Sequence, residues 1–187
     1  MIVVWVIIGI VVILAIIFAG NYNGLVGLRN QVKNAWAQID VQLKRRHDLI
    51  PNLVETVKGY MQYERATLEA VTNARNLAQA RVSAGPAERA KLEGELSGAL
   101  ARLLAVVENY PDLKANQNFL ALQEQLTSTE NKISFSRQFY NDSVLKFNNR
   151  TQMFPSNIIA NMTGFKPGEF FEVKAAEERE VPKVSFG

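Results

Sequence analysis

An uninterrupted apolar run at the start of the chain is the strongest constraint on its fold. From Ile2 to Ala19 every side chain is apolar or glycine, and the first charged side chain is Arg29. A helix of this length rises about 27 Å, close to the thickness of a hydrocarbon core. A cleaved signal peptide is less favoured, because a basic leading region and an Ala-x-Ala cleavage site are missing. The run therefore predicts a transmembrane anchor over residues 1–20.

The charges that follow this run predict how the anchor is oriented. Cations dominate the first segment beyond it, with Asp40 as the only acid, and the cations are Arg29, Lys33, Lys44, Arg45 and Arg46. Positively charged flanks stay in the cytoplasm. We therefore expect a short N-terminus outside and a cytoplasmic soluble domain, with the lipid bilayer as the first partner.

The composition excludes several function classes. The chain has 187 residues and a net charge of +3, from 21 basic and 18 acidic residues. This balance is too mild for a dedicated nucleic-acid binder. Cysteine is absent, which excludes disulfides, thiolate metal sites and a lipid-modified anchor. No nucleophile elbow, His-Glu-x-x-His motif or glycine-rich phosphate loop occurs, so we expect no enzyme activity, no metal and no cofactor.

The rest of the chain has the apolar periodicity of long helices. One stripe with spacings of three and four runs from Leu25 to about residue 82. Pro51 should either kink or end the helix within this stripe, and we favour the kink. Gly85-Pro86 predicts a break, followed by a helix to about residue 110, another from 113 to 150, and a short helical turn around Ile158. The predicted fold is all-α: a transmembrane helix continuing into an antiparallel bundle of three to four long helices. The predicted domains are the anchor (1–20), the bundle (21–164) and a C-terminal segment with a charged tail (165–187).

Helix lengths lead to a prediction of self-association. A first helix from residue 21 to 82 would be about 93 Å long, whereas the returning helices would reach about 37 and 57 Å. The membrane-proximal stripe would then lack an intramolecular partner, and it consists of Leu25, Leu28, Val32, Trp36, Ile39 and Leu43. Two coverings are possible: the same stripe in other copies, giving a homo-oligomer around a coiled-coil stalk, or the apolar segment 154–173 folding back. We place the homo-oligomer first.

Two groups of polar residues are candidate sites. The first surrounds the only histidine and the proline that follows it, and it comprises Lys44, Arg45, Arg46, His47, Asp48, Pro51 and Asn52. A proton relay or phosphate site is conceivable, but one histidine cannot complete a metal site, and a solvated charge cluster is the favoured interpretation. Arg29 and Lys33 lie close enough to the membrane to attract anionic headgroups. Lys44 to Arg46 lie too far away and are better placed to pair with acids on a neighbouring helix.

The second group lies within the helix predicted over 113–150. Its members are Glu130, Asn131, Arg137 and Asn141. They form either a buried polar network, with a Glu130–Arg137 pair that fixes helix register, or an exposed face. Both interpretations stay open.

Several motifs resemble those of one protein family. They are Tyr22-Asn23-x-Leu25-Val26-x-Leu28-Arg29-Asn30, the long run from Ile39 to Val54, Leu122-Gln123-Glu124-x-Leu126, Thr129-Glu130-Asn131-Lys132-Ile133, Arg137-Gln138-x-Tyr140-Asn141-Asp142, Phe154-Pro155 and Phe170-Phe171-Glu172. Together they closely resemble the bacterial LemA family over nearly the whole chain. Phe147 stands where the family pattern leads us to expect tyrosine, and the segment 162–165 is a looser version of the usual ending.

The resemblance implies a bacterial inner-membrane protein with a helical bundle and no established enzymatic activity. Relatives have been linked to membrane organisation, including magnetosome formation, and to gene neighbourhoods with membrane proteases. Our first hypothesis is a self-assembling scaffold that organises or shapes the bilayer. The second is an adaptor that presents the bundle to a membrane protease or a signalling protein.

Overall fold

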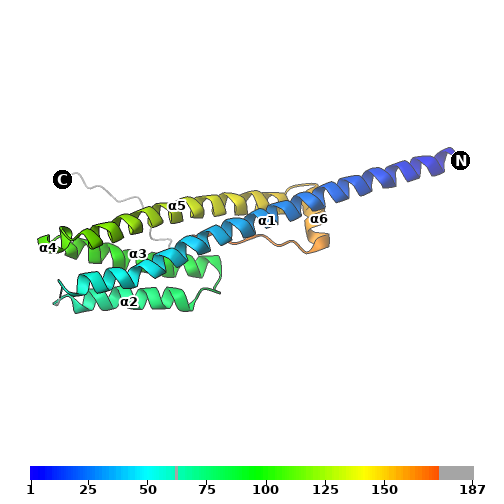
Figure 1. Cartoon of the computed structure of the whole chain (residues 1–187). Coiled ribbons are helices and arrows are strands. Elements are labelled where there is room, and N and C mark those ends of the chain that lie inside the picture. Colours follow the sequence, from blue (N-terminus) through cyan, green and yellow to red (C-terminus); the bar gives the residue numbers. More distant parts are fainter. Residues whose placement is uncertain (62, 173–187) are drawn as a thin grey trace, which may run out of the picture. The chain divides into compact units, whose positions relative to one another are not determined.

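The computed structural model describes residues 1–61 and 63–172, and these residues form helices and connecting loops (Figure 1). The helices are α1 (Ile2–Lys58), α2 (Arg65–Ala80), α3 (Pro86–Val107), α4 (Pro111–Lys114), α5 (Gln117–Gln152) and α6 (Ser156–Thr163). The all-α fold is confirmed. Two compact units divide the described residues: unit 1 comprises residues 1–48 and 124–170, and unit 2 comprises residues from 49–123 together with 171 and 172.

Helix α1 begins in the apolar run and continues for 57 residues. It is the one described helix long and apolar enough to cross a membrane, and its most apolar stretch is entirely uncovered. The helix continues through Pro51 and ends at Lys58. The predicted continuation to residue 82 is wrong, because the backbone amides of Tyr60 and Met61 both donate to the Val57 carbonyl at 3.0 Å and close a turn there.

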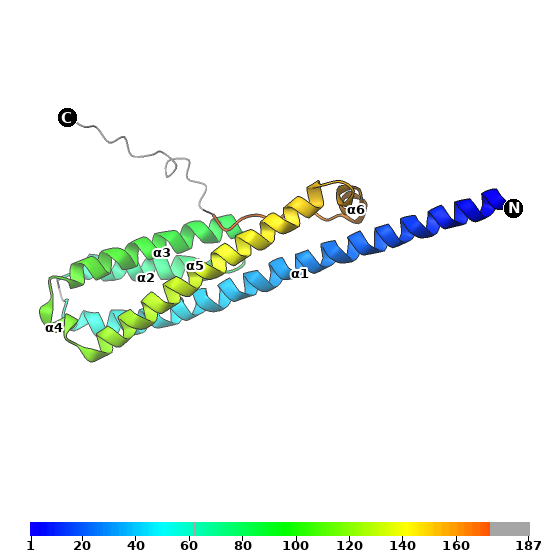
Figure 2. The same ribbon diagram turned by 90° about the horizontal axis from the view of Figure 1, so that it is seen from above.

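Within unit 1, α5 returns antiparallel to α1 (Figures 1 and 2). The Trp36 and Tyr140 rings meet at a centroid distance of 5.2 Å, and Arg46 forms an ion pair with Glu130. These pairs share one antiparallel register. In this unit the extramembrane part of α1 is about 42 Å long, and the returning part of α5 is about 43 Å. The expectation of an uncovered stripe was wrong because the first helix is shorter than predicted, so the returning helix matches it.

The C-terminal segment completes the covering of α1 in unit 1. Leu25 is buried in a cluster with Phe147, Ile159 and Ala160, against which Leu28, Val32 and Phe165 also pack. The segment beyond α6 is held on α5 by side chains. Asn148 exchanges two hydrogen bonds with the Gly168 backbone, at 2.7 and 3.0 Å. Residues 159–165 therefore cover the Leu25 end of the stripe, as in the second predicted covering, while α5 lies along the rest of it.

Unit 2 contains the end of α1, α2, α3 and α4. Helices α2 and α3 pack against one another, and α3 begins at Pro86 after Gly85, which confirms the predicted break. The single helix predicted from residue 113 is divided into α4 and α5, because the Asn116 side-chain oxygen accepts hydrogen bonds from the amides of Asn118 and Phe119 and starts a new helix. The predicted charged tail from Lys174 onward lies outside the described residues.

Candidate membrane and docking surfaces

A charged pair joins the two long helices of unit 1. The Arg46 side chain is 1% exposed, and its guanidinium Nη1 donates to the Glu130 carboxylate, whose side chain is 40% exposed. Arg46 thus pairs with an acid on a neighbouring helix of its own chain. A guanidinium that has lost its water is stabilised by such a carboxylate, and the pair fixes the register of α5 on α1. This is a structural role.

The remaining residues of the basic motif face outward. Lys44, Arg45, Asp48, Pro51 and Asn52 are exposed, in agreement with a solvated cluster. For Arg46 and His47 that interpretation is wrong, since both are buried. They continue the inward face of α1 three and four residues after Leu43, and this spacing could have identified them.

The second predicted polar group is only partly inward. Glu130 and Asn141 are half-buried, whereas Asn131 and Arg137 are exposed. Of the two interpretations left open, the buried pair of Glu130 with Arg137 does not hold, because the Arg137 side chain is exposed. The buried hydroxyls of α5 were not predicted. Those of Thr129 and Ser143 each donate to the carbonyl four residues earlier, at 2.7 Å, so their burial leaves no donor unsatisfied.

The titration of Tyr140 is clearly displaced. Its hydroxyl donates to the Glu169 backbone carbonyl at 2.9 Å. Burial, and secondarily the Glu169 carboxylate, raise the pKa of Tyr140 from 10.0 to about 12. The neutral phenol therefore belongs to the folded packing of α5 against the C-terminal segment.

Apolar side chains gather where unit 1 meets the membrane span. Along α1 the Phe18 ring stacks on the Tyr22 ring at 6.4 Å, and Tyr22 meets Phe165 edge-on at 6.0 Å. The Arg29 guanidinium lies 5.0 Å from the Phe165 ring centre. The exposed apolar residues of α6 and the preceding turn are Met153, Phe154, Ile158 and Met162, which we call the membrane-proximal surface.

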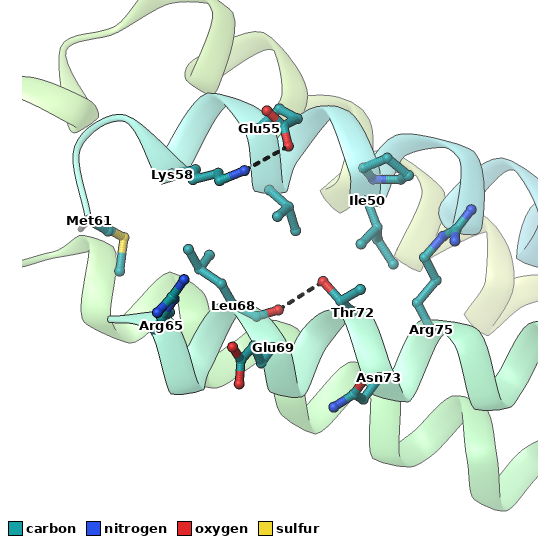
Figure 3. Close-up of a pocket in the computed structure, with 12 residues that line it drawn as sticks. Ile50, Glu55, Lys58, Met61, Arg65, Leu68, Glu69, Thr72, Asn73 and Arg75 are labelled. Carbon is teal, nitrogen blue, oxygen red and sulfur yellow. Dashed lines mark hydrogen bonds and ion pairs between the residues drawn. The ribbon is translucent and has the colours of Figure 1, made fainter. Parts of the chain in front are cut away.

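A cleft of about 750 Å³ lies in unit 2 between the end of α1 and α2 (Figure 3). Ile50 of α1 and Leu68 of α2 point into the space between these helices, and Met61 lies at its end. Both charge types rim the cleft, with cations Lys58, Arg65 and Arg75 and acids Glu55 and Glu69. Sequence reasoning missed this cleft because it joined α1 and α2 into one helix.

Two further charged residues of unit 2 were missed. Arg89 and Glu93 lie one turn apart on α3, and both are buried. Buried charges in a helix that otherwise presents Leu96, Ala99 and Leu103 to the core are not readable from the apolar pattern alone. Among residues 1–61 and 63–172, no group of three or more His, Asp or Glu side chains is placed to hold a metal.

Comparisons with known proteins agree with the helical, membrane-attached arrangement. The chain is 26% identical over 180 residues to Magnetosome protein MamQ 2 of Paramagnetospirillum magneticum, covering 83% of this chain and 66% of that protein. It is 24% identical over 165 residues to Protein LemA of Metamycoplasma hominis, covering 88% of this chain and 75% of that protein. Magnetosome protein MamQ of Magnetospirillum gryphiswaldense is 24% identical over 180 residues, with 83% and 66% covered. The chain spans just under two thirds of the length of the MamQ relatives.

The names of these relatives state no enzymatic activity. The candidate span in α1 and the relatives together indicate a membrane-anchored protein. The model of the LemA family matches residues 35–186, which is most of the chain. With the motifs that already resembled this family, the match shows that the chain belongs to the LemA family.

Proposed function

We propose that this chain is a single-pass protein of the bacterial inner membrane that catalyses no reaction and serves as an adaptor, with its helical units in the cytoplasm. Its partner is a membrane protease or a signalling protein, which docks in the cleft of unit 2. The observation that supports this role is the cleft itself, since a largely apolar groove with a charged rim is the shape in which proteins seat a partner's helix.

The chemistry of the cleft describes the partner segment. Half-buried Val54 and the buried side chains of Ile50, Met61 and Leu68 form an apolar floor, so the partner must offer apolar side chains on one face. Glu55 lies 3.6 Å from Lys58 and partly neutralises it. With three cations and two acids, the rim carries a net positive charge, which favours a partner with acids beside its apolar face.

Site-specific crosslinking in cells tests this role. A photoreactive benzophenone residue replaces Glu69, which lines the cleft, or Leu77, which is exposed on the same helix but lies outside it. We expect one discrete heteromeric adduct from position 69, none from position 77, and loss of the adduct when Val54→Trp fills the cleft. Equal adducts at both positions, or no adduct at position 69, would refute the adaptor role.

A self-assembling scaffold that organises the bilayer is the second candidate. The stripe from Leu25 to Leu43 gives it little support, because Leu25, Ile39 and Leu43 are buried within the chain and Leu28, Val32 and Trp36 are half-buried. Another surface does: Phe135 and Phe139 are both exposed and lie one turn apart on the outer face of α5. The three MamQ relatives are named as magnetosome proteins, which is consistent with work at a membrane.

Sizing of detergent-solubilised protein distinguishes the scaffold from the adaptor. The scaffold predicts a large particle that Phe135→Lys disperses, while Val41→Lys, on the outer face of α1, serves as the control. A wild-type particle that contains one copy would remove the scaffold. Charge at Trp36 or Ile39 is no test, since it would disrupt the packing of unit 1 itself.

A further inference from the structure

We propose that the membrane-proximal surface, made by α6 and the turn before it, is a second membrane contact. Its exposed apolar side chains enter the interface of the bilayer that α1 spans. This goes beyond the adaptor role and does not depend on the cleft, because the whole surface belongs to unit 1.

The level of α6 along α1 is the first argument. Leu25 lies about 9 Å beyond Ala19 along the helix axis. The interfacial region of a bilayer extends about 5 to 8 Å beyond the hydrocarbon on each side. Ile159 and Ala160 of α6 pack on Leu25, so α6 is held at the outer edge of this headgroup region. Tyr22, which contacts Phe165, is typical of this depth as well.

The division of α6 into two faces is the second argument. Ile159 and Ala160 point inward and are buried, whereas Ile158 and Met162, one turn apart, are exposed. The turn before the helix adds exposed Phe154. Both views show α6 running across α1 and not alongside it (Figures 1 and 2). A short helix that presents Ile158 and Met162 on its free side, beside exposed Asn161, and lies across a membrane-spanning helix has the arrangement of an interfacial helix.

Charge is the third argument, and it selects lipid over a protein as the occupant. Residues 19–36 and 143–168, which form the membrane end of unit 1, contain no Asp or Glu and five cations: Arg29, Lys33, Lys146, Arg150 and Lys166. Arg150 is held towards the span by a 2.8 Å hydrogen bond from its Nη2 to the Asn21 side-chain oxygen. Apolar side chains beside cations without acids match an anionic bilayer surface, with the apolar groups in the acyl boundary and the cations at the headgroups.

Fluorescence quenching in vesicles tests this contact directly, because the chain has no native cysteine. The full-length protein carries one cysteine at Met162, labelled with the fluorophore NBD, in vesicles of phosphatidylethanolamine and phosphatidylglycerol. The matched control is Phe135→Cys, since Met162 and Phe135 are both 73% exposed. Lipids with a nitroxide at carbon 5 of the acyl chain serve as the quencher.

We expect the nitroxide lipids to quench the label at position 162 at least threefold more than the label at position 135, with a blue-shifted emission at position 162 only. Equal quenching at the two positions would overturn the proposal. So would a blue shift at position 162 without lipid quenching, since it would show that protein covers this surface. The crosslinking at position 69 tests the cleft of unit 2, whereas the quenching at position 162 tests the surface of unit 1. Each proposal can therefore fail while the other holds.

Discussion

The pair between Arg46 and Glu130 should respond asymmetrically to loss of either partner. Arg46 is 1% exposed, so it cannot recover water when the carboxylate is removed, whereas Glu130 is 40% exposed and can be hydrated when Arg46 is removed. Glu130→Gln should therefore destabilise the fold by about 2 kcal/mol, the range for a hydrogen bond to a charged group. Arg46→Met keeps the buried aliphatic volume and removes the buried charge, so it should cost less than about 1 kcal/mol.

The assay uses Trp36, which packs on Tyr140 in the same seam. With Trp5→Phe in the membrane span, Trp36 is the only tryptophan of the chain, and its fluorescence follows opening of the α1–α5 seam during heating in detergent. For a chain of this size, about 2 kcal/mol lowers the Tm by roughly 4 to 8 °C. Glu124→Gln, at an exposed position of the same helix, should leave the Tm unchanged. An unchanged Tm for Glu130→Gln together with a large drop for Arg46→Met would refute the reasoning.

Three further predictions concern packing and titration. Leu25 is fully buried and packs on Phe147, so Leu25→Ala should lower the free energy of unfolding by about 2 to 5 kcal/mol in denaturant titrations. The control Val41→Ala, at a position that is 63% exposed, should change this free energy by less than about 0.5 kcal/mol. The pKa of Tyr140 is raised from 10.0 to about 12 in the folded state, so the neutral phenol stabilises the fold fully below pH 10. This contribution amounts to up to about 2.7 kcal/mol, and it should be lost as the pH rises from about 10 to 12. Tyr140→Phe should remove that alkaline loss, and an absorbance titration should lose its latest-titrating tyrosine; an unchanged titration would refute the assignment. Gly164→Ala should destabilise α6 by about 1 to 2 kcal/mol, since Gly164 has φ 76°, and limited proteolysis after Thr163 should become faster; an unchanged rate would contradict it.

The sequence pattern predicted the elements more reliably than their ends. The apolar run, the break at Gly85-Pro86 and the short helix around Ile158 are all observed. The turn after Lys58 was missed, because Leu68 and Val71 of α2 continue the spacing of α1 by coincidence and hide the boundary. That one error made the first helix too long, and the predicted need for other copies followed from it.

Burial of charge was the other feature that the sequence could not resolve. Arg46 and His47 stand beside exposed Lys44 and Arg45, so composition alone describes a solvated cluster. The helical phase set by Leu43 and Ile50 places Arg46 and His47 on the inward face of α1. The carboxylate of Glu130 reaches Arg46 only because α5 packs on α1 in this antiparallel register. The cleft between α1 and α2 depends in the same way on two segments that meet only after the missed turn.

Intramolecular covering of the α1 stripe is the central claim, and a crosslink tests it most directly. In membranes, the otherwise cysteine-free chain carries Tyr22→Cys with Phe165→Cys, whose rings lie 6.0 Å apart at the membrane end of the stripe, or Tyr22→Cys with Val41→Cys as a control, and is treated with a short bismaleimide. We expect an efficient crosslink for the first pair that keeps the mobility of a monomer in denaturing electrophoresis, and no crosslink within the monomer for the second pair. A crosslinked dimer as the main product of the first pair would show that other copies cover the stripe, and it would contradict the account.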